Sequence, residues 1–262
     1  AGNGNLYNGT AFRTDTGGTL PTSLQAWWEL DELFGTRFDK VSPGVGPAAQ
    51  FTAANSEFLS VADNADLSVA DIDFTACTHV YLDTVAADQA IMSKVNSALA
   101  REWELIFDDD AGGDRFRFSV FDSTGASVGT VASTTFGAPA AATWYQVCGT
   151  HRGGTTDQVA IRVNAGTEDT SATTGFPSDT VSLFRIGARN LITSDYLNGR
   201  AELAAFWKRN LPAADITTLY NSNNGLHCKD WTDQLRRSAI SCWPLNEGSL
   251  TRYDWLGAND LT

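Results

Sequence analysis

Between residues 51 and 207, apolar and polar residues alternate in steps of two, in short runs separated by Gly, Asp, Asn or Ser clusters. Such alternation sends successive side chains to opposite faces of a β-strand. Strands are expected at 74–82, 144–152, 158–166, 182–189 and 201–209. Many short strands with frequent turn signals predict an antiparallel β-sandwich.

The clearest hairpin joins EWELIF to RFRFSVF through the acidic turn DDDAGGD. Trp103, Leu105 and Phe107 then share one face, and Phe116, Phe118 and Val120 share one face of the return strand. Helical signals are scarce. The best is NLPAADITTLYN, where Pro212 fits a first turn and Ile216, Leu219 and Tyr220 recur at helical spacing.

The two ends of the chain repeat one another. Residues 23–39 match residues 238–254 without a gap at an offset of 215, in the pairs Trp28 and Trp243, Leu30 and Leu245, Glu32 and Glu247, Thr36 and Thr251, Arg37 and Arg252, and Asp39 and Asp254. Upstream, Leu6-Tyr7-Asn8 echoes Leu219-Tyr220-Asn221. This order indicates a tail of one repeat, a full unit, and the opening strand of the next.

The repeat divides the chain into an N-terminal extension over 1–22, a sandwich over 23–221, and a linker with a second opening strand over 222–262. A strand with no domain after it would expose apolar surface and open backbone groups, so it is expected to pair. Residues 255–262 are expected to fill the place missing after Asp39, within the chain or by donation to a neighbour; the alternative is that the ends merely dock on their own domain. The expected interface residues are Trp243, Leu245, Trp255, Asn259, Leu261 and Thr262.

Composition allows a substantial core, because 42% of residues are hydrophobic and 19% are charged. The formal net charge of −13 repels phosphate backbones, which argues against nucleic acid as a partner. No apolar run approaches the ~20 residues that span a bilayer, so no membrane partner is expected.

Four cysteines lack CxxC spacing, which argues against a zinc or thioredoxin-type site. Cys228 and Cys242 flank a short polar segment and are candidates for a disulfide. Cys77 and Cys148 lie in strand-like runs and either pair or remain buried thiols.

The succession of WWELDE, AAQFTAANSEFLSVADNADLS, IDFTACTHVYL, ATWYQVCGTHR, FRIGAR and LNGRAELAAFWKRNLPAADITTLYN over residues 23–221 resembles the laminin-G-like jelly roll of the concanavalin A-like lectin/glucanase superfamily. The likeness is strongest to units of bacterial surface and phage structural proteins. It implies an all-β, two-sheet antiparallel sandwich with one short C-terminal helix. Two departures stand out: the first copy lacks the Asn-x-Leu-Thr strand, and Glu202 stands where such units often place Asp, which weakens transfer of a family ligand site.

No cofactor is expected, apart from a possible calcium ion. Its first candidate ligands are Asp108, Asp109, Asp110 and Asp114 in the hairpin turn, although a solvated acidic tip is the better interpretation because the spacing fits no EF-hand pattern. A second acidic group, in loop-like sequence, consists of Glu57, Asp63, Asp66, Asp71 and Asp73. The three histidines have no evident carboxylate partner in sequence.

No catalytic residue is expected. Gly125-Ala126-Ser127-Val128-Gly129 matches a nucleophile elbow, but strand-like flanks on both sides predict a turn. Glu29-Leu30-Asp31-Glu32 is similar to the carboxylate strand of glucanases, yet Phe34 occupies the position of the second acid.

These observations favour a non-catalytic structural subunit of an extracellular, cell-surface or virion assembly, joined to itself or to sister subunits through its end strands. The alternative is a carbohydrate-binding module that uses some of the eight tryptophans. For the tryptophans in predicted strands, core packing is the default expectation.

Overall fold

A computed structural model describes residues 48–96, 100–110, 113–154, 157–189, 195–247 and 251–262. Residues 48–262 form one compact unit, which is described here. The predicted N-terminal extension and the first copy of the repeat lie outside the described residues. Among the described residues, no helix is long and apolar enough to cross a membrane.

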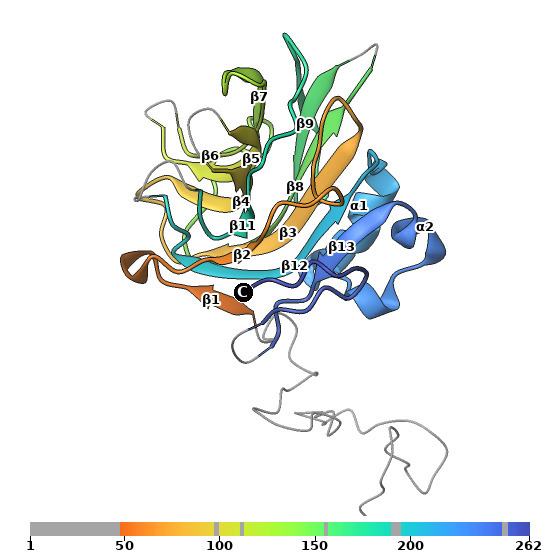
Figure 1. Cartoon of the computed structure of the whole chain (residues 1–262). Coiled ribbons are helices and arrows are strands. Elements are labelled where there is room, and N and C mark those ends of the chain that lie inside the picture. Colours follow the sequence, from red (N-terminus) through yellow and green to blue (C-terminus); the bar gives the residue numbers. More distant parts are fainter. Residues whose placement is uncertain (1–47, 97–99, 111–112, 155–156, 190–194, 248–250) are drawn as a thin grey trace, which may run out of the picture. The chain divides into compact units, whose positions relative to one another are not determined.

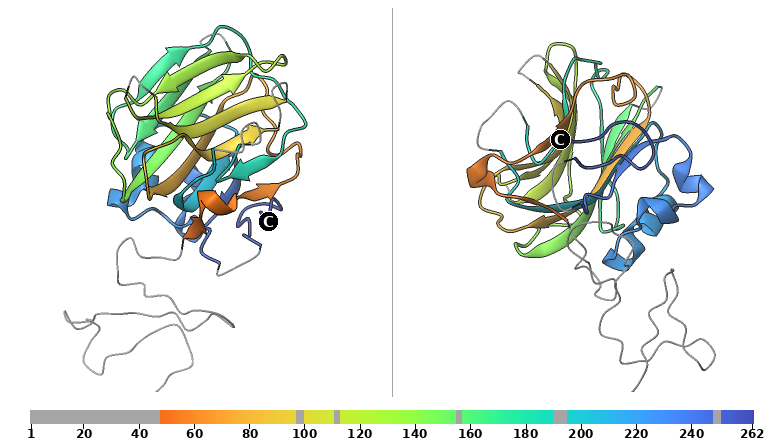
Figure 2. Two further views of the ribbon diagram at one scale, coloured as in Figure 1. Left: turned by 90° about the vertical axis from the view of Figure 1, so that its left-hand side faces the viewer. Right: turned by 60° about the horizontal axis from the view of Figure 1, so that its bottom comes forward.

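The unit is a sandwich of two antiparallel sheets, which face each other in Figures 1 and 2. One sheet has the order β1 (Ala49–Phe51), β12 (Gly199–Trp207), β3 (Phe74–Leu82), β8 (Thr143–Arg152), β9 (Gln158–Val163) and β10 (Asp169–Ala172), and β13 (Ala239–Trp243) also pairs with β12. The other has the order β2 (Leu59–Val61), β11 (Phe184–Ile186), β4 (Gln89–Val95), β5 (Arg101–Asp108), β6 (Arg115–Phe121) and β7 (Ser127–Ala132).

Aromatic side chains from both sheets fill the space between them. Trp103 of β5 stacks on Phe206 of β12 with ring centroids 5.9 Å apart, and Phe74 of β3 contacts both rings. Large, fully buried rings dominate such a core because each removes much apolar surface from water. Gly149 of β8 makes room for the Phe118 ring, which a Cβ at that position would approach to 2.3 Å.

A helical layer covers part of the outer face of the seven-stranded sheet (Figure 1). It contains α1 (Ala213–Tyr220), the single turn α2 (Asp233–Arg236), and the 3-10 turns η2 (Asn221–Asn223) and η3 (Cys228–Asp230); another 3-10 turn, η1 (Ala53–Asn55), follows β1. Helix α1 begins after Pro212 and ends at Asn221, which adopts the left-handed conformation. Trp207 of β12 stacks on Trp231 of this layer with ring centroids 5.0 Å apart.

Both cysteine pairs form disulfides beneath this layer. Cys77 and Cys148 are register partners on β3 and β8, and their side chains join the second apolar cluster. Cys228 of η3 is linked to Cys242 of β13 and so ties the helical layer to the edge of the sheet. Disulfides of this kind are typical of proteins from oxidising compartments.

The second copy of the repeat closes the open edge of both sheets within the same chain. Strand β13 pairs with β12, and the backbone of Thr262 exchanges hydrogen bonds of 2.8 and 3.0 Å with Ser60 of β2. Trp243 lies between the sheets, where it stacks on Phe184 of β11 at 4.9 Å. Residues 222–262 belong to the same compact unit as the strands of the sandwich.

The predicted fold class is confirmed. The strand expected at 74–82 and the return strand of the hairpin have the predicted bounds, and the other expected strands differ at their ends. Trp103, Leu105 and Phe107 all face the core as the alternation indicated. Strand β4 was not expected, since its sequence QAIMSKV is buried along its whole length and shows no clean alternation.

Candidate functional site: a row of planar side chains on the outer sheet face

Four planar side chains form a continuous row across neighbouring strands of the seven-stranded sheet. Trp144 of β8 is the register partner of Tyr81 of β3, which faces Arg200 of β12, which faces Gln50 of β1. The Trp144 and Tyr81 rings lie 5.5 Å apart, and the Arg200 guanidinium lies 4.8 Å from the Tyr81 ring centroid. Arg200 also donates a 2.8 Å hydrogen bond from Nε to the Gln50 side chain.

Strand alternation places this row on the face opposite the core. Val80 and Leu82 on either side of Tyr81 are fully buried in the core, so Tyr81 points outward. Trp144 and Tyr81 are half-buried, whereas Arg200 and Gln50 are exposed. The row is therefore pre-ordered by contacts between its members and still open to solvent.

Polar groups continue the row on its Gln50 side. The Gln50 amide donates to the backbone oxygen of Gly199 at 2.9 Å and reaches Asp83 at 3.5 Å. A guanidinium, an amide and a carboxylate thus lie beside two aromatic faces. Such a set offers apolar ring surface together with donors and acceptors for hydroxyl groups.

A second row of side chains lies two residues further along the same strands and is more deeply buried than the first row. Glu202, His79 and Gln146 are consecutive register partners across β12, β3 and β8. Burial raises the pKa of Glu202 to about 7 and lowers the pKa of His79 to about 4. Within the described residues, His79 Nε2 and Gln146 Oε1 are buried without a hydrogen-bond partner.

An open hollow of about 590 Å³ lies beside helix α1. Its lining comes from the end of β9 and from α1 and η2: Asn164, Ala165, Thr217, Thr218, Tyr220, Asn221, Ser222 and Leu226. Asn164 also accepts a 3.0 Å hydrogen bond from the backbone of Gln146, so the hollow adjoins the second row.

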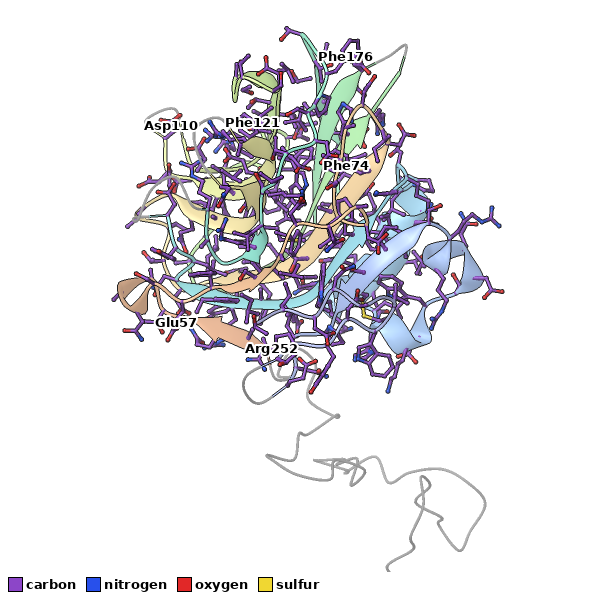
Figure 3. The ribbon with its side chains drawn as sticks, viewed as in Figure 1. Glu57, Phe74, Asp110, Phe121, Phe176 and Arg252 are labelled. Atoms are coloured by element: carbon purple, nitrogen blue, oxygen red, sulfur yellow. A yellow bond between two sulfur atoms is a disulfide. The ribbon has the colours of Figure 1, made fainter. Side chains whose placement is uncertain are left out.

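Among the described residues, the predicted ligands at the acidic hairpin tip do not form a group of three whose oxygen atoms all lie within 4.8 Å of one another. The Asp108 carboxylate pairs with Arg117, while burial raises its pKa. Desolvation raises the pKa of Asp109, and the nearby carboxylates, Asp114 foremost among them, raise it further. Asp110 lies at the edge of the molecule in Figure 3. A calcium ion at this tip stays a prediction.

The second predicted acidic group is dispersed over separate contacts. Glu57 accepts hydrogen bonds from Asn55 and from the backbone of Thr52. Asp73 accepts one from the backbone of Gly153, and Asp71 belongs to a cluster described below.

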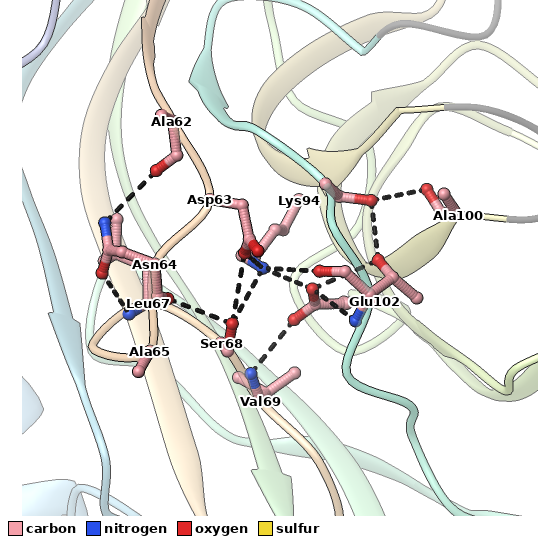
Figure 4. A network of polar contacts seen from close by, with 12 residues as sticks. Ala62, Asp63, Asn64, Ala65, Leu67, Ser68, Val69, Lys94, Ala100 and Glu102 are labelled. Carbon is pink, nitrogen blue, oxygen red and sulfur yellow. Dashed lines mark hydrogen bonds and ion pairs between the residues drawn. The ribbon is translucent and has the colours of Figure 1, made fainter.

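Asp63 takes part in a buried ion-pair network around Lys94 (Figure 4). The Lys94 ammonium lies 2.6 Å from Asp63, contacts Glu102 directly, and donates to Ser68 and to the Thr180 carbonyl at 3.3 Å each. Burial raises the pKa of Glu102 to about 7, against the opposing effect of the Lys94 charge. The Lys94 ammonium lies among these oxygen atoms and supplies the positive charge, so this network needs no metal ion.

The six predicted interface residues differ in how deeply their side chains are buried. Trp243, Leu245, Leu261 and Asn259 are buried, Thr262 is fixed by its backbone, and Trp255 is 53% exposed. The Trp243 indole donates a 2.6 Å hydrogen bond to the Asn259 carbonyl. Four of these side chains are thus used inside the chain, whereas the side chains of Trp255 and Thr262 are exposed, and the Trp255 ring contacts the His227 ring edge-on.

In the C-terminal segment, the residues that match the first copy of the repeat are the ones that make the anchoring contacts. Asp254 accepts hydrogen bonds from the backbone of Cys242, Leu256 and Asn259. Arg252, labelled in Figure 3, forms a backbone bridge with Leu261. The Glu247 carboxylate accepts from the backbone of Tyr253 at 3.0 Å.

The segment that matches a nucleophile elbow, residues 125–129, lies in a turn and the strand that follows it. Ser127 begins β7 after a turn in which the Asp122 carboxylate accepts from Thr124 and Ala126, and its hydroxyl lies 2.8 Å from that of Thr130. A strand follows it, so the nucleophile elbow is absent at this position. Residues 29–32 lie outside the described residues.

Sequence reasoning missed the planar row. The expectation that strand tryptophans pack in the core holds for Trp103, Trp207 and Trp243, all of which are fully buried. It fails for Trp144, which is half-buried on the outer face. The available signal was local, because Trp144 and Tyr81 each sit next to core positions in alternating strands.

The family model described as concanavalin A-like lectin/glucanases superfamily (Laminin_G_3) matches residues 54–217, which is more than half of the chain. No curated protein matches the sequence. Among solved structures, a candidate carbohydrate-binding protein from Bacteroides ovatus is similar with a TM-score of 0.60 and 14% identity, over 83% of this chain and 57% of that one. The heptameric SAP-like pentraxin from Limulus polyphemus is similar with a TM-score of 0.50 and 14% identity, over 69% of this chain and 82% of that one. At these identities the structural likeness concerns the fold.

Proposed function

Because the chain belongs to the concanavalin A-like lectin/glucanases superfamily, we propose that it is a non-catalytic binding module that takes carbohydrate on its outer sheet face. The observation that carries this proposal is the row Trp144, Tyr81, Arg200 and Gln50. The names of similar proteins, one of them a candidate carbohydrate-binding protein, agree with this choice.

The chemistry of the row suits a saccharide. A pyranose ring has apolar C–H faces and a rim of hydroxyl groups, so it packs on aromatic faces while its rim needs donors and acceptors. Trp144 and Tyr81 offer the faces, and Arg200, Gln50 and Asp83 offer the polar partners. Their mutual contacts fix them before binding, which limits the side-chain entropy lost on association.

The module is expected to act outside the cell, on a cell surface or in a virion. Two disulfides favour an oxidising compartment. The excess of carboxylates keeps nucleic acid an unfavourable partner.

A glycan array followed by calorimetry on the best ligand tests the proposal. Trp144→Ala and Arg200→Ala are expected to weaken binding at least about tenfold, because each removes contact worth at least about 1.4 kcal/mol. Trp255→Ala is the matched control, since it removes an exposed tryptophan from another part of the surface. Thermal unfolding of each variant shows that the fold is retained.

The outcomes separate the possible sites. Loss of binding in Tyr220→Ala alone would indicate that the ligand binds in the hollow beside α1. Loss of binding in Trp255→Ala alone would indicate that it binds to the C-terminal segment. The absence of any ligand on a broad array would remove carbohydrate binding as the function.

A second candidate function is assembly through the repeated end segments. In the second copy the matched residues anchor the segment on the sandwich, and the first copy carries the same residue types at 28, 30, 32, 36, 37 and 39. One chain therefore contains two segments that both carry the residue types that anchor the second copy to the sandwich. Exchange of these segments between chains would produce polymers.

Light scattering on the purified chain tests assembly directly. Multimers that dissociate in a chain lacking 255–262, or in Trp28→Ala, are expected if the segments connect subunits. A monomer at all concentrations, unchanged by either variant, would contradict this second function and leave carbohydrate binding untouched.

A further inference from the structure

A histidine and two aspartates from three separate segments meet at one end of the sandwich. Asp71 lies in the loop before β3, His151 lies near the end of β8, and Asp157 directly precedes β9. One ring nitrogen of His151 and one carboxylate oxygen from each aspartate all lie within 4.8 Å of one another. In the described part of the chain, this is the one such group of three potential metal ligands.

The hydrogen bond on one side of the His151 ring defines its tautomer. Nδ1 lies 2.8 Å from the backbone oxygen of Ile72, and a carbonyl oxygen only accepts, so Nδ1 carries the proton. In the neutral form of the ring, Nε2 is then the nitrogen with a free lone pair. A histidine that donates from one nitrogen to a backbone carbonyl is the arrangement that prepares the other nitrogen as a metal ligand.

His151 Nε2 has no partner within the described residues although the side chain is fully buried. Asp157 Oδ1 is also buried and finds no hydrogen-bond partner in the described part of the chain. The same holds for the hydroxyl of Thr173, whose backbone nitrogen donates to the Asp157 carbonyl at 3.1 Å. A buried polar atom left without a hydrogen bond costs about 1 to 3 kcal/mol, so several at one place indicate a missing ligand.

The backbone holds the Asp71 loop against the end of β8. Gly153 donates from its backbone nitrogen to Asp73 at 2.9 Å. A Cβ at Gly153 would lie 3.0 Å from the Asp71 backbone carbonyl, so the absence of a side chain permits this close approach. The exposed Asp71 carboxylate is therefore kept near the buried imidazole by the fold.

The two carboxylates of this group bring negative charge to one place, which favours a cation there. Arg152, next to His151 in the sequence, is committed to Glu168 through contacts of 2.7 and 2.8 Å. A water molecule would satisfy hydrogen bonds here but would not offset the two negative charges. A divalent cation does both.

We propose that His151, Asp71 and Asp157 bind one divalent transition-metal ion of the zinc class at this end of the sandwich. One imidazole nitrogen with two carboxylate oxygens is a donor set for Zn²⁺, Co²⁺ or Mn²⁺, whereas calcium takes oxygen ligands. The bound ion joins the loop before β3 to β8 and β9. Its remaining coordination positions are taken by water or by an oxygen of a bound ligand.

Titration of the untagged full chain with Co²⁺ tests the site, because visible d–d absorption reports cobalt held by a nitrogen and oxygen donor set. Calorimetry with Zn²⁺, Mn²⁺ and Ca²⁺ then ranks the ions. We expect one equivalent of Zn²⁺ to bind more tightly than Ca²⁺. Asp71→Asn and Asp157→Asn should each weaken Zn²⁺ at least tenfold and abolish the cobalt bands.

Two controls address other sources of binding. His227→Ala removes a surface histidine, and Asp109→Asn removes a carboxylate of the hairpin tip; neither should change Zn²⁺ affinity. Asp71 is exposed, so its variant reports on metal even if His151→Gln fails to fold.

Zn²⁺ binding that survives both Asp71→Asn and Asp157→Asn would overturn the proposal. So would the absence of binding at millimolar Zn²⁺, which would leave an ordered water as the occupant, or a clear preference for Ca²⁺.

Discussion

Replacing Glu202 with glutamine should stabilise the protein at neutral and alkaline pH. Glu202 lies on the outer face of β12 with its pKa raised from 4.5 to about 7 by burial, and no hydrogen bond to its carboxyl accompanies that shift. Below pH 4.5 the carboxyl is protonated in the folded and unfolded chains alike, so its burial then costs no ionisation free energy.

The cost develops between those two pKa values. As the pH rises from 4.5 to about 7, the unfolded chain releases this proton while the folded chain keeps it, so the free energy of unfolding falls. At about 1.4 kcal/mol per pH unit the full loss is at most about 3.5 kcal/mol, and solvent near the half-buried carboxyl reduces it to about 1 to 3 kcal/mol. Above pH 7 the loss stays constant.

Urea unfolding of the parent chain and Glu202→Gln at several pH values between 4 and 8 measures this difference. The variant should become progressively more stable than the parent as the pH rises, with most of the change between pH 4.5 and 7. Glu57→Gln is the opposite-sign control, because hydrogen bonds from Asn55 and Thr52 lower the pKa of Glu57. Parallel profiles for the parent and Glu202→Gln would refute the reasoning.

Three further substitutions probe the framework, each measured by urea unfolding. Lys94→Met should lower the free energy of unfolding by about 3 to 5 kcal/mol, because it leaves the buried Glu102 carboxylate unpaired. The double variant with Glu102→Gln should regain part of this stability. Additive effects of the two substitutions would contradict the pairing. Removing the disulfide through Cys228→Ser with Cys242→Ser should cost about 3 kcal/mol, and equal stability of the parent with and without reductant would argue against it. Trp243→Ala should cost about 3 to 5 kcal/mol, and a loss below about 1 kcal/mol would show that the C-terminal segment does not complete the core.

The sequence by itself determined the fold class and, in the strands with clean alternation, the side that faces the core. Alternation assigned Trp103, Leu105 and Phe107 to the interior, and Pro212 with the following apolar spacing located α1. These features depend on neighbours along the chain, so they are legible without knowing which strands pair. The end repeat was also visible, together with the expectation that its second copy needs a sheet.

Apart from the hairpin of β5 and β6, only the tertiary structure decided which strands adjoin. The pairing of β13 with β12 shows that the second copy completes its own sandwich, whereas the sequence allowed a neighbour's. The planar row needs the registers of four strands, and alternation gives the face of Trp144 and Tyr81 without their partners. In the His151 cluster, Asp71 lies 80 residues before the histidine, so no local pattern could have brought these two side chains together.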